Sequence, residues 1–335
     1  MSASTPSRPA PSSHRIAILG YGACALASCF WGTGFYFGRI ALDEMSVSYM
    51  VLYRFLFASL VMLPVAFTHR ARFTRHEATL LLISAFFGVP VQFLIQFYGL
   101  SLTTVSHASL MVGTMPVLLG VGAVLFAGER LDLLGWGALF ASTAGAALIV
   151  LGGHHARSRT GGPSLEGDLL IVLSLITALV WVLISKKLLL THSAPVVSAY
   201  TILAGTAMLA LWVLGPWVLR TWSLGKLLNA PLLAHTAAPP PFFHVSAAAW
   251  GALAAGGIAC TATTTFLWNW GIHRVPASRA GVFLNIEPLL GSFLGVQLLG
   301  EHLGPFAWLG GALILGAAIT LTTQGHEPQP EIILE

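Results

Sequence analysis

The chain has 335 residues, of which 16 are Lys or Arg and 12 are Asp or Glu. Charged residues make up only 8%, against roughly 25% in an average soluble domain. Hydrophobic residues reach 56%, and the mean hydropathy is +0.81. Because charged side chains normally cover a soluble surface, this composition excludes a soluble enzyme, a nucleic-acid-binding protein and a disordered regulator. It predicts a polytopic membrane protein.

A transmembrane helix needs about 20 mostly apolar residues. The chain carries about ten such stretches, and most connections between them are short. Their apolar runs are continuous, which favours helices over the alternating strands of a membrane β-barrel. We therefore expect an all-α integral membrane protein with ten transmembrane helices at 16–38, 48–68, 78–99, 105–127, 132–152, 167–187, 195–219, 246–270, 276–299 and 304–324.

The N-terminal segment 1–15 is rich in Ser and Pro, which is typical of a disordered tail. The first span lacks a convincing cleavage site, so we expect a helix and not a signal peptide. Lys and Arg are more frequent in the loops on the same side as the N-terminus, among them the basic loop 69–76. Because basic loops stay inside, both tails (1–15 and 325–335) are predicted to be cytoplasmic, in an inner or plasma membrane.

Arg54, Arg279 and Glu287 are the charged residues that lie clearly within the predicted spans, away from the loops. An ionisable group in the bilayer costs about 2.5–3.5 kcal/mol, so these side chains should face the protein interior. Arg54 either anchors an anionic substrate or braces adjacent helices, and bracing is the favoured interpretation; Arg279 is close enough to a helix end to snorkel. Glu287 either couples transport to protons and cations or pairs with one of the two arginines.

Amide, hydroxyl and aromatic side chains within the spans suit a small amphipathic solute. Gln92 and Gln96 share one helical face because they are four residues apart. His107, near a helix end, is either a group that titrates near neutral pH or an ordinary helix contact. The alternative for the whole set is that its members bridge helices, which we favour for the threonine run of the eighth span. The predicted substrate-binding residues are Trp31, Thr33, Tyr36, Gln92, Gln96, His107, Trp181, Thr265 and Asn269.

The second half of the chain repeats the first. One constant offset pairs Ser106 with Ser278, Ala108 with Ala280, Pro116 with Pro288, Glu129 with Glu301, and Trp136 with Trp308. Five helices in each half is an odd number, so the second half enters the membrane in the opposite orientation. We expect two inverted five-helix repeats, 16–152 and 167–324, joined by a linker loop at 153–166. Inverted repeats are typical of secondary transporters, whose substrate site lies near the midplane.

Small residues and turns have structural interpretations. Gly34-x-x-x-Gly38 and Gly291-x-x-x-Gly295 allow close helix approach, for internal packing rather than for a dimer. Glu129 and Glu301 each follow a glycine at a turn and are expected to cap the next helix, whose N-terminus favours negative charge.

No metal or cofactor site is predicted. Cys24, Cys29 and Cys260 lie in predicted spans without CxxC spacing, and His154-His155 has no further ligands nearby. The chain also lacks a GxxxxGK[ST] loop, so ATP-driven transport by this chain alone is not expected. No catalytic pattern indicates an enzyme.

Several motifs resemble those of the drug/metabolite transporter superfamily, EamA-type. Phe30–Phe35 (Phe-Trp-Gly-Thr-Gly-Phe) resembles the opening of its first helix, and Arg54-Phe55 resembles the start of its second. The runs 106–131 and 277–303, each with a central Pro and a closing Gly-Glu, resemble its fourth and ninth helices. The resemblance covers 16–323 in two copies. His107 and Arg279, at matching positions, are more polar than the family's usual residues.

The resemblance implies a carrier. Members of this superfamily export amino acids, other metabolites or drugs, and some exchange phosphorylated sugars or nucleotide sugars. We expect export or exchange of a small amino-acid-like or amphipathic solute by alternating access, with proton coupling as one option. A gated passive channel or a non-transporting membrane sensor are the alternatives. The expected partners are the solute and membrane lipid, without nucleic acid, and the chain is expected to be a monomer or a homodimer.

Overall fold

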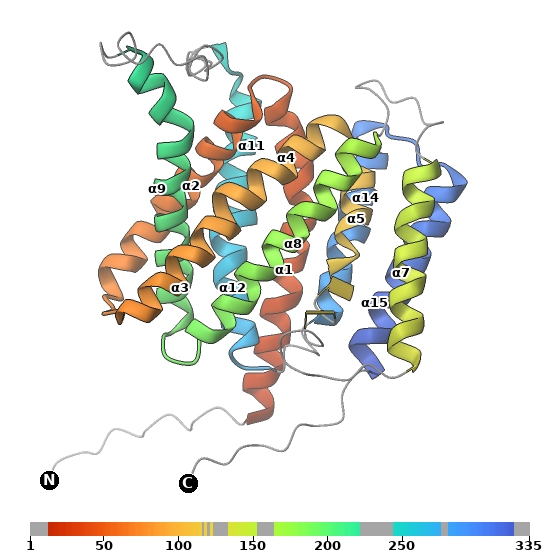
Figure 1. Ribbon diagram of the computed structural model, residues 1–335, viewed down its shortest axis with the longest axis horizontal. Helices are drawn as coiled ribbons and strands as arrows, with labels where there is room; N and C mark the ends of the chain where they lie inside the picture. Colours follow the sequence, from red (N-terminus) through yellow and green to blue (C-terminus); the bar gives the residue numbers. More distant parts are fainter. Residues whose placement is uncertain are drawn as a thin grey trace, which may run out of the picture.

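The computed structural model describes residues 13–115, 117–118, 121–122, 133–152, 164–221, 244–275 and 281–324. Within these ranges the chain is helical apart from turns and short connections, and it forms no strand. The helices run side by side between an upper and a lower end (Figure 1). We use "upper end" for the end where α1 finishes. The helices of the first half are α1 (Ser13–Leu42), α2 (Val47–Thr68), α3 (Arg75–Phe86), α4 (Gln92–Leu102), α5 (Val105–Val112) and α7 (Leu133–Gly152).

The second half contains a similar series. Its helices are α8 (Leu165–Leu188), α9 (Ala194–Thr221), α11 (Ala247–Gly257), α12 (Thr264–Ile272), α14 (Ile286–Leu299) and α15 (Pro305–Gln324). A 3-10 turn, η6 (Gly281–Asn285), precedes α14. The predicted linker at 153–166 and the predicted spans at 105–127 and 276–299 lie partly outside the described residues.

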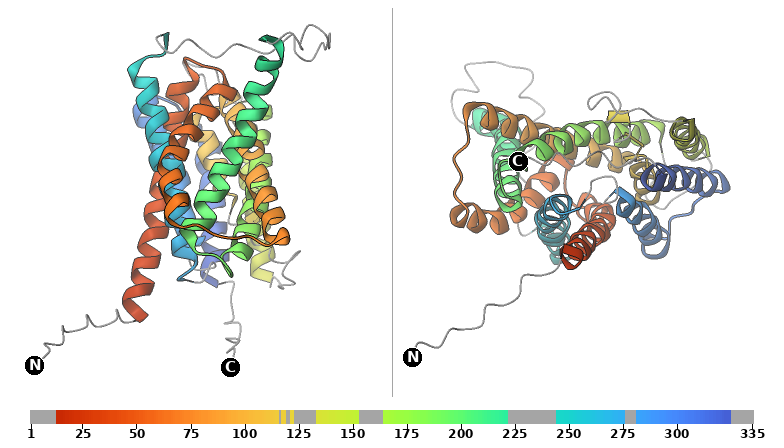
Figure 2. Two further views of the ribbon diagram at one scale, coloured as in Figure 1. Left: turned by 90° about the vertical axis from the view of Figure 1, so that its left-hand side faces the viewer. Right: turned by 90° about the horizontal axis from the view of Figure 1, so that it is seen from below.

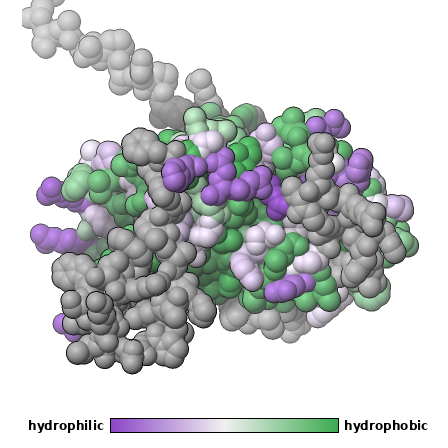
Figure 3. Space-filling view, turned by 90° about the horizontal axis from the view of Figure 1, so that it is seen from above, coloured by the Kyte–Doolittle hydropathy of each residue, from purple (hydrophilic) through white to green (hydrophobic). Residues whose placement is uncertain are grey.

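Five helical segments are long and apolar enough to cross a membrane, counting only the described part of the chain. They are Ile18–Leu42, Val47–Thr68, Arg75–Leu102, Leu165–Leu188 and Ala194–Pro216. Large apolar side chains such as Leu60, Phe140 and Leu211 are exposed on the sides of the bundle, where they suit contact with lipid tails. Hydrophilic side chains gather across the upper end (Figure 3). The prediction of an all-helical chain with membrane-spanning helices is confirmed at this level.

A π-helical turn interrupts the third long helix of each half. η1 (Phe87–Val91) joins α3 to α4, and η5 (Ile258–Thr263) joins α11 to α12. In η1, Pro90 has no N–H to donate to the preceding turn, which favours the wider turn. The sequence predicted unbroken helices over these stretches, because one additional residue in a turn leaves the apolar pattern almost unchanged. The offset that pairs Ser106 with Ser278 also brings the two π turns into register.

The helix contacts couple the two halves throughout. α2 packs against α9, α4 against α8, α1 against α12 and α14, and α5 against α14. The α7–α15 pair lies at one edge of the molecule (Figures 1 and 2). At Gly99 a Cβ atom would lie 2.9 Å from the carbonyl oxygen of Gly167, so only glycine permits the α4–α8 approach. The glycines of both predicted Gly-x-x-x-Gly pairs likewise face residues of the same chain.

Candidate functional site: a cavity between the two halves

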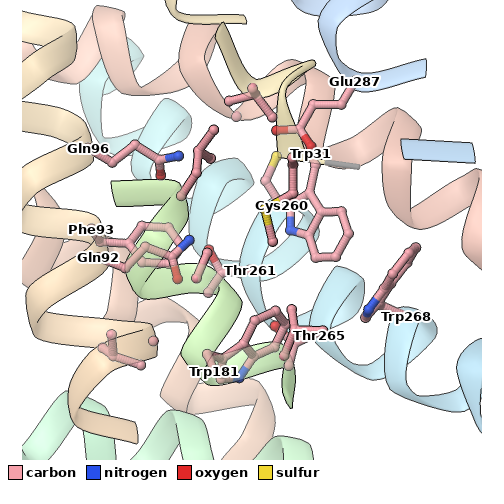
Figure 4. A pocket seen from close by; sticks show the side chains of 18 of the residues that line it. Trp31, Gln92, Phe93, Gln96, Trp181, Cys260, Thr261, Thr265, Trp268 and Glu287 are labelled. Atoms are coloured by element: carbon pink, nitrogen blue, oxygen red, sulfur yellow. The ribbon is translucent and has the colours of Figure 1, made fainter. Parts of the chain in front are cut away.

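A cavity of about 110 Å³ lies between helices of the two halves. It has room for several water molecules or a small organic solute. Its walls come from α1, α2, α4 and α5 of the first half and from α8, α9, α12 and α14 of the second, together with both π turns. Figure 4 shows the labelled side chains converging on this space.

Aromatic rings form much of the cavity wall. Trp31 and Trp268 lie with ring centroids 5.3 Å apart, one from each half of the chain. Trp181 packs against Gly88 of η1, where any larger residue would collide with the indole ring. Such rings present a large apolar surface at fixed positions and suit the apolar part of a solute.

Arg54 is held by hydrogen bonds to its neighbours. Its Nε donates to Thr261 Oγ1 at 2.9 Å, and its two Nη atoms donate to the carbonyl oxygens of Gly34 (3.4 Å) and Cys260 (3.3 Å). Phe93 and Phe97 lie with their ring centroids 5.4 and 5.1 Å from the guanidinium carbon. Only 4% of the residue is exposed. These contacts join α2 to α1 and to η5, which fits the bracing role.

Glu287 has a different environment on the same cavity. Its carboxylate points into the open space (Figure 4) and accepts no hydrogen bond from the described residues. No ion pair within 4.0 Å joins it to Arg54 in the described structure. The backbone around Glu287 lies against Gly32 of α1, where an added Cβ would be 3.0 Å from the Glu287 carbonyl oxygen. α14 therefore brings this carboxylate close to α1 while leaving its oxygen atoms accessible.

The two glutamines, Gln92 and Gln96, line the cavity from the same face of α4 (Figure 4). Gln96 is buried with 8% exposed. Neither side chain makes a hydrogen bond to the described residues, so both amides are available to a solute or to water.

The comparisons with known proteins identify the family. Residues 18–151 and, separately, residues 165–323 match the EamA-like transporter family. The chain belongs to this family. The family resemblance inferred from the motifs is thereby confirmed.

Named relatives of this EamA-like chain are transporters. It is 23% identical to the uncharacterized transporter YetK of Bacillus subtilis, over 92% of this chain and 88% of that protein. It is 25% identical to an uncharacterized transporter of Archaeoglobus fulgidus, over 90% and 97%. A probable terminal-alkyne amino-acid exporter of Streptantibioticus cattleyicolor is 23% identical, over 87% and 89%. A solved crystal structure aligns with a TM-score of 0.57 and 18% identity, over 91% of this chain and 96% of that chain, which shows a shared fold.

The structure brings many of the predicted site residues of this EamA-like protein together. The cavity wall contains Trp31, Arg54, Gln92, Gln96, Trp181, Thr265 and Glu287. Arg279 lies outside the described residues.

Other predicted residues are absent from the cavity wall and have other contacts. Thr33 Oγ1 donates to the carbonyl oxygen of Phe30 in the same helix at 2.7 Å and lies 3.1 Å from Cys260 Sγ of η5. Asn269 Nδ2 donates to Ser198 Oγ at 2.8 Å and so joins α12 to α9. Tyr36 packs edge-on against Phe37. His107 lies 3.4 Å from Asp168, near the upper end. A helix presents several faces to its neighbours, and residue type alone does not identify the face that lines a cavity.

Sequence reasoning missed several wall residues. Phe93, Phe97 and Val89 carry no polar group, so nothing in the sequence separates them from apolar side chains that face lipid. Thr261 belongs to the threonine run, for which helix bridging was favoured, and its hydroxyl does receive a hydrogen bond from Arg54.

Glu301 caps a different helix from the one expected. The next helix, α15, begins at Pro305, but the Glu301 carboxylate accepts from the backbone N–H groups of Val105 (2.8 Å) and Ser106 (2.7 Å) of α5. Gly300 adopts a left-handed conformation (φ 64°), which reverses the chain after α14 and directs Glu301 back to α5. Its counterpart Glu129 lies outside the described residues.

Proposed function

We propose that this protein is a secondary transporter that exports or exchanges a small amino-acid-like or amphipathic solute by alternating access. The observation that carries the proposal is the cavity itself. It lies between two halves that match the same family, and it exposes Gln92, Gln96 and Glu287 without hydrogen-bond partners among the described residues. Polar groups that stay unpaired in an apolar interior are costly unless water or a solute satisfies them.

The proposed architecture is ten transmembrane helices in two inverted repeats. In the repeat, α1 corresponds to α8, α2 to α9, α3 to α11 and α4 to α12. When each helix is replaced by its counterpart, the α4–α8 contact becomes the α12–α1 contact, and the α3–α9 contact becomes the α11–α2 contact; the structure contains all four. The α2–α9 and α7–α15 contacts convert into themselves. Two related halves that face each other would have this pattern, and the matching π turns support the same arrangement.

The proposed orientation places the lower end in the cytoplasm of a cell with an inner or plasma membrane. α1 begins and α15 ends at this end (Figure 1). The basic loop between α2 and α3, together with Lys186 and Lys187 at the end of α8, also lies there. Basic loops normally remain on the cytoplasmic side.

In the proposed binding mode, the tryptophans contact the apolar part of the solute, and the glutamine amides and Glu287 contact its polar groups. Arg54 mainly braces the wall, because its guanidinium already has three acceptors in the protein. Proton coupling through Glu287 is part of the proposal. The proposed partners are the solute and lipid, and the proposed state is a monomer or homodimer.

The test is transport by purified protein in proteoliposomes. A thermal-shift screen of amino acids and amphipathic metabolites first selects a stabilising solute. Vesicles loaded with that solute are expected to take up its labelled form faster than empty vesicles, because a carrier returns more quickly when occupied. Gln92→Ala and Gln96→Ala should raise the solute concentration that gives half-maximal uptake. Gln297→Ala, which changes an exposed glutamine of α14, should leave that concentration unchanged. Flux without acceleration by internal solute would indicate a channel and contradict the carrier mechanism.

A further inference from the structure

Buried polar side chains gather outside the cavity, at the upper end where α4 finishes and α5 begins. His107 and Asp168 are each only 1% exposed, Glu301 is 3% exposed and Arg39 is 7% exposed. Ionisable groups at such depth require partners, because burial without pairing is costly. Their contacts therefore indicate what this cluster does.

The contacts connect helices of both halves. Asp168 of α8 accepts a hydrogen bond from Thr103 Oγ1 at 2.6 Å, and its other carboxylate oxygen lies 3.4 Å from His107 Nδ1 of α5. Arg39 of α1 donates to the carbonyl oxygens of Leu100 (3.1 Å) and Thr103 (3.5 Å). The Nε2 atom of His107 is buried and has no hydrogen-bond partner in the described structure. The ring therefore leaves this nitrogen unsatisfied in the described structure, whichever of its protonation states it adopts.

The pair stands between the cavity and the upper end. Val112 of α5 and Leu175 of α8 line the cavity, and His107 and Asp168 lie five and seven residues further up the same helices. At 1.5 Å per residue these are distances of roughly 7 and 10 Å along the helix axes. α4 packs closely on α8, and α5 on α14, so the His107–Asp168 contact joins two helix pairs. A solute that leaves upward between α5 and α8 has to separate them.

We propose that the His107–Asp168 pair is a proton-binding site whose occupation holds the upper end of the cavity closed. The inference rests on the proposed function, because it assumes that the two ends open in turn. It goes beyond that function by assigning His107 a role that is separate from solute binding.

The charges around His107 determine whether acidic or alkaline pH strengthens its contact with Asp168. Asp168 faces it from α8, Glu301 approaches α5 from the end of α14, and Arg39 reaches the same region from α1. Two carboxylates and one guanidinium leave the cluster one negative charge in excess, and a proton on His107 neutralises it. Asp43, which lies 4.0 Å from Arg39, and Glu166 and His302 are exposed to solvent, and the described residues of α4 and α15 carry no charge. Acidic pH therefore strengthens the contact, and alkaline pH weakens it.

Histidine suits a proton-binding site at this position. It is the side chain whose charge ordinarily changes between about pH 5 and 8.

The experiment measures the upper end directly, without solute. Spin labels replace the exposed Leu298 of α14 and Leu165 of α8 in the full chain, in lipid nanodiscs, with the three native cysteines changed to alanine. Between pH 8 and pH 5.5 the ratio of short to long distances should rise about tenfold, equivalent to about 1.4 kcal/mol. His107→Asn, which keeps a donor near the Nδ1 position but does not titrate, should abolish this change. Asp168→Asn should abolish it and favour the long distance.

His192→Asn is the matched control. His192 lies 3.3 Å from Glu77 near the lower end, so it also forms a histidine–carboxylate pair, and its variant should keep the pH response. A response that persists in a folded His107→Asn or Asp168→Asn variant, or a distance that does not change with pH in the unmodified protein, would overturn the proposal. If one variant does not fold, the other gives the same test. Absence of solute flux would contradict the transport function but would leave the distance measurement valid.

Discussion

Arg54 and Glu287, a basic and an acidic residue, lie on the wall of one cavity, but their surroundings differ. Arg54 uses hydrogen bonds to Thr261, Gly34 and Cys260, whereas Glu287 has no such partner among the described residues. Losing Arg54 would leave several buried acceptors unpaired, at about 1–3 kcal/mol each. Losing the charge of Glu287 would leave no protein donor unpaired. The first residue therefore serves mainly the fold, and the second is available for transport.

Glu287→Gln should preserve folding but remove the dependence of transport on a pH gradient. The substitution keeps the shape of the side chain and removes its ability to release a proton. The measurement is solute flux into proteoliposomes with and without an imposed pH gradient. Glu166→Gln, which changes an exposed carboxylate of α8, is the control and should behave like the unmodified protein. Unchanged coupling in Glu287→Gln would exclude this carboxylate as the proton carrier.

The predictability of the site differed from residue to residue. Gln92 and Gln96 were predictable because two amides on one face of an apolar helix must find polar surroundings. Phe93 lies between them in sequence and also lines the cavity, yet an apolar residue fits lipid and cavity equally well. The His107–Asp168 contact was not predictable, because it joins residues from opposite halves whose registration depends on the packed helices.

At the scale of elements, the close α4–α8 contact depends on the absence of side chains. Gly99→Ala should destabilise the protein by about 1–3 kcal/mol, because its Cβ would meet the backbone of Gly167, which cannot rotate away. Gly137→Ala on α7 is the control, since an added Cβ there meets nothing within 4 Å. It should leave stability equal or raise it by up to about 1 kcal/mol through better helix propensity. Melting temperatures of the purified variants would test this contrast, and equal losses would contradict it.

Ser246 is the N-cap residue of α11 and donates hydrogen bonds to Glu44, so the stability of this helix start should depend on pH. The side-chain and backbone hydrogen bonds from Ser246 hold the pKa of Glu44 below its usual value. A carboxyl whose pKa is lowered by folding stabilises the fold above its unfolded pKa of about 4.3, and this contribution is lost as the pH falls through the folded pKa. Protection of the first amides of α11 against hydrogen exchange, taken relative to their intrinsic rate at each pH, should therefore fall below about pH 4, and Glu44→Gln should remove that dependence. A loss of protection of equal size in the variant would assign the effect to another group.

The helices themselves were largely predictable, since long apolar stretches in a chain with few charges leave little alternative. The predicted and observed starts of α2, α8, α9 and α11 agree within two residues. The π turns were not predictable from the apolar pattern. They depend on how each third helix packs around the cavity and, at η5, on the hydrogen bond that Arg54 donates to the carbonyl oxygen of Cys260.

At the scale of the whole molecule, the orientation can be tested by labelling from one side. Arg72→Cys lies in the loop at the lower end, and Ser101→Cys lies near the upper end; both positions are exposed. In vesicles with the native outward orientation, a membrane-impermeant maleimide should label the cysteine at 101 and label that at 72 only after permeabilisation. A chain lacking cysteines provides the background. The opposite pattern would invert the proposed topology.

The anchoring of Arg54 has a consequence for how the membrane voltage acts. Its acceptors belong to α1 of the first half and η5 of the second, so the guanidinium stays at the junction of the halves in the proposed cycle. Voltage supplies about 2.3 kcal/mol per elementary charge per 100 mV, and only to charge that crosses the membrane. The buried cation then contributes little to the moving charge. The voltage dependence of flux should therefore report the charge of the solute plus that of any proton exchanged for it.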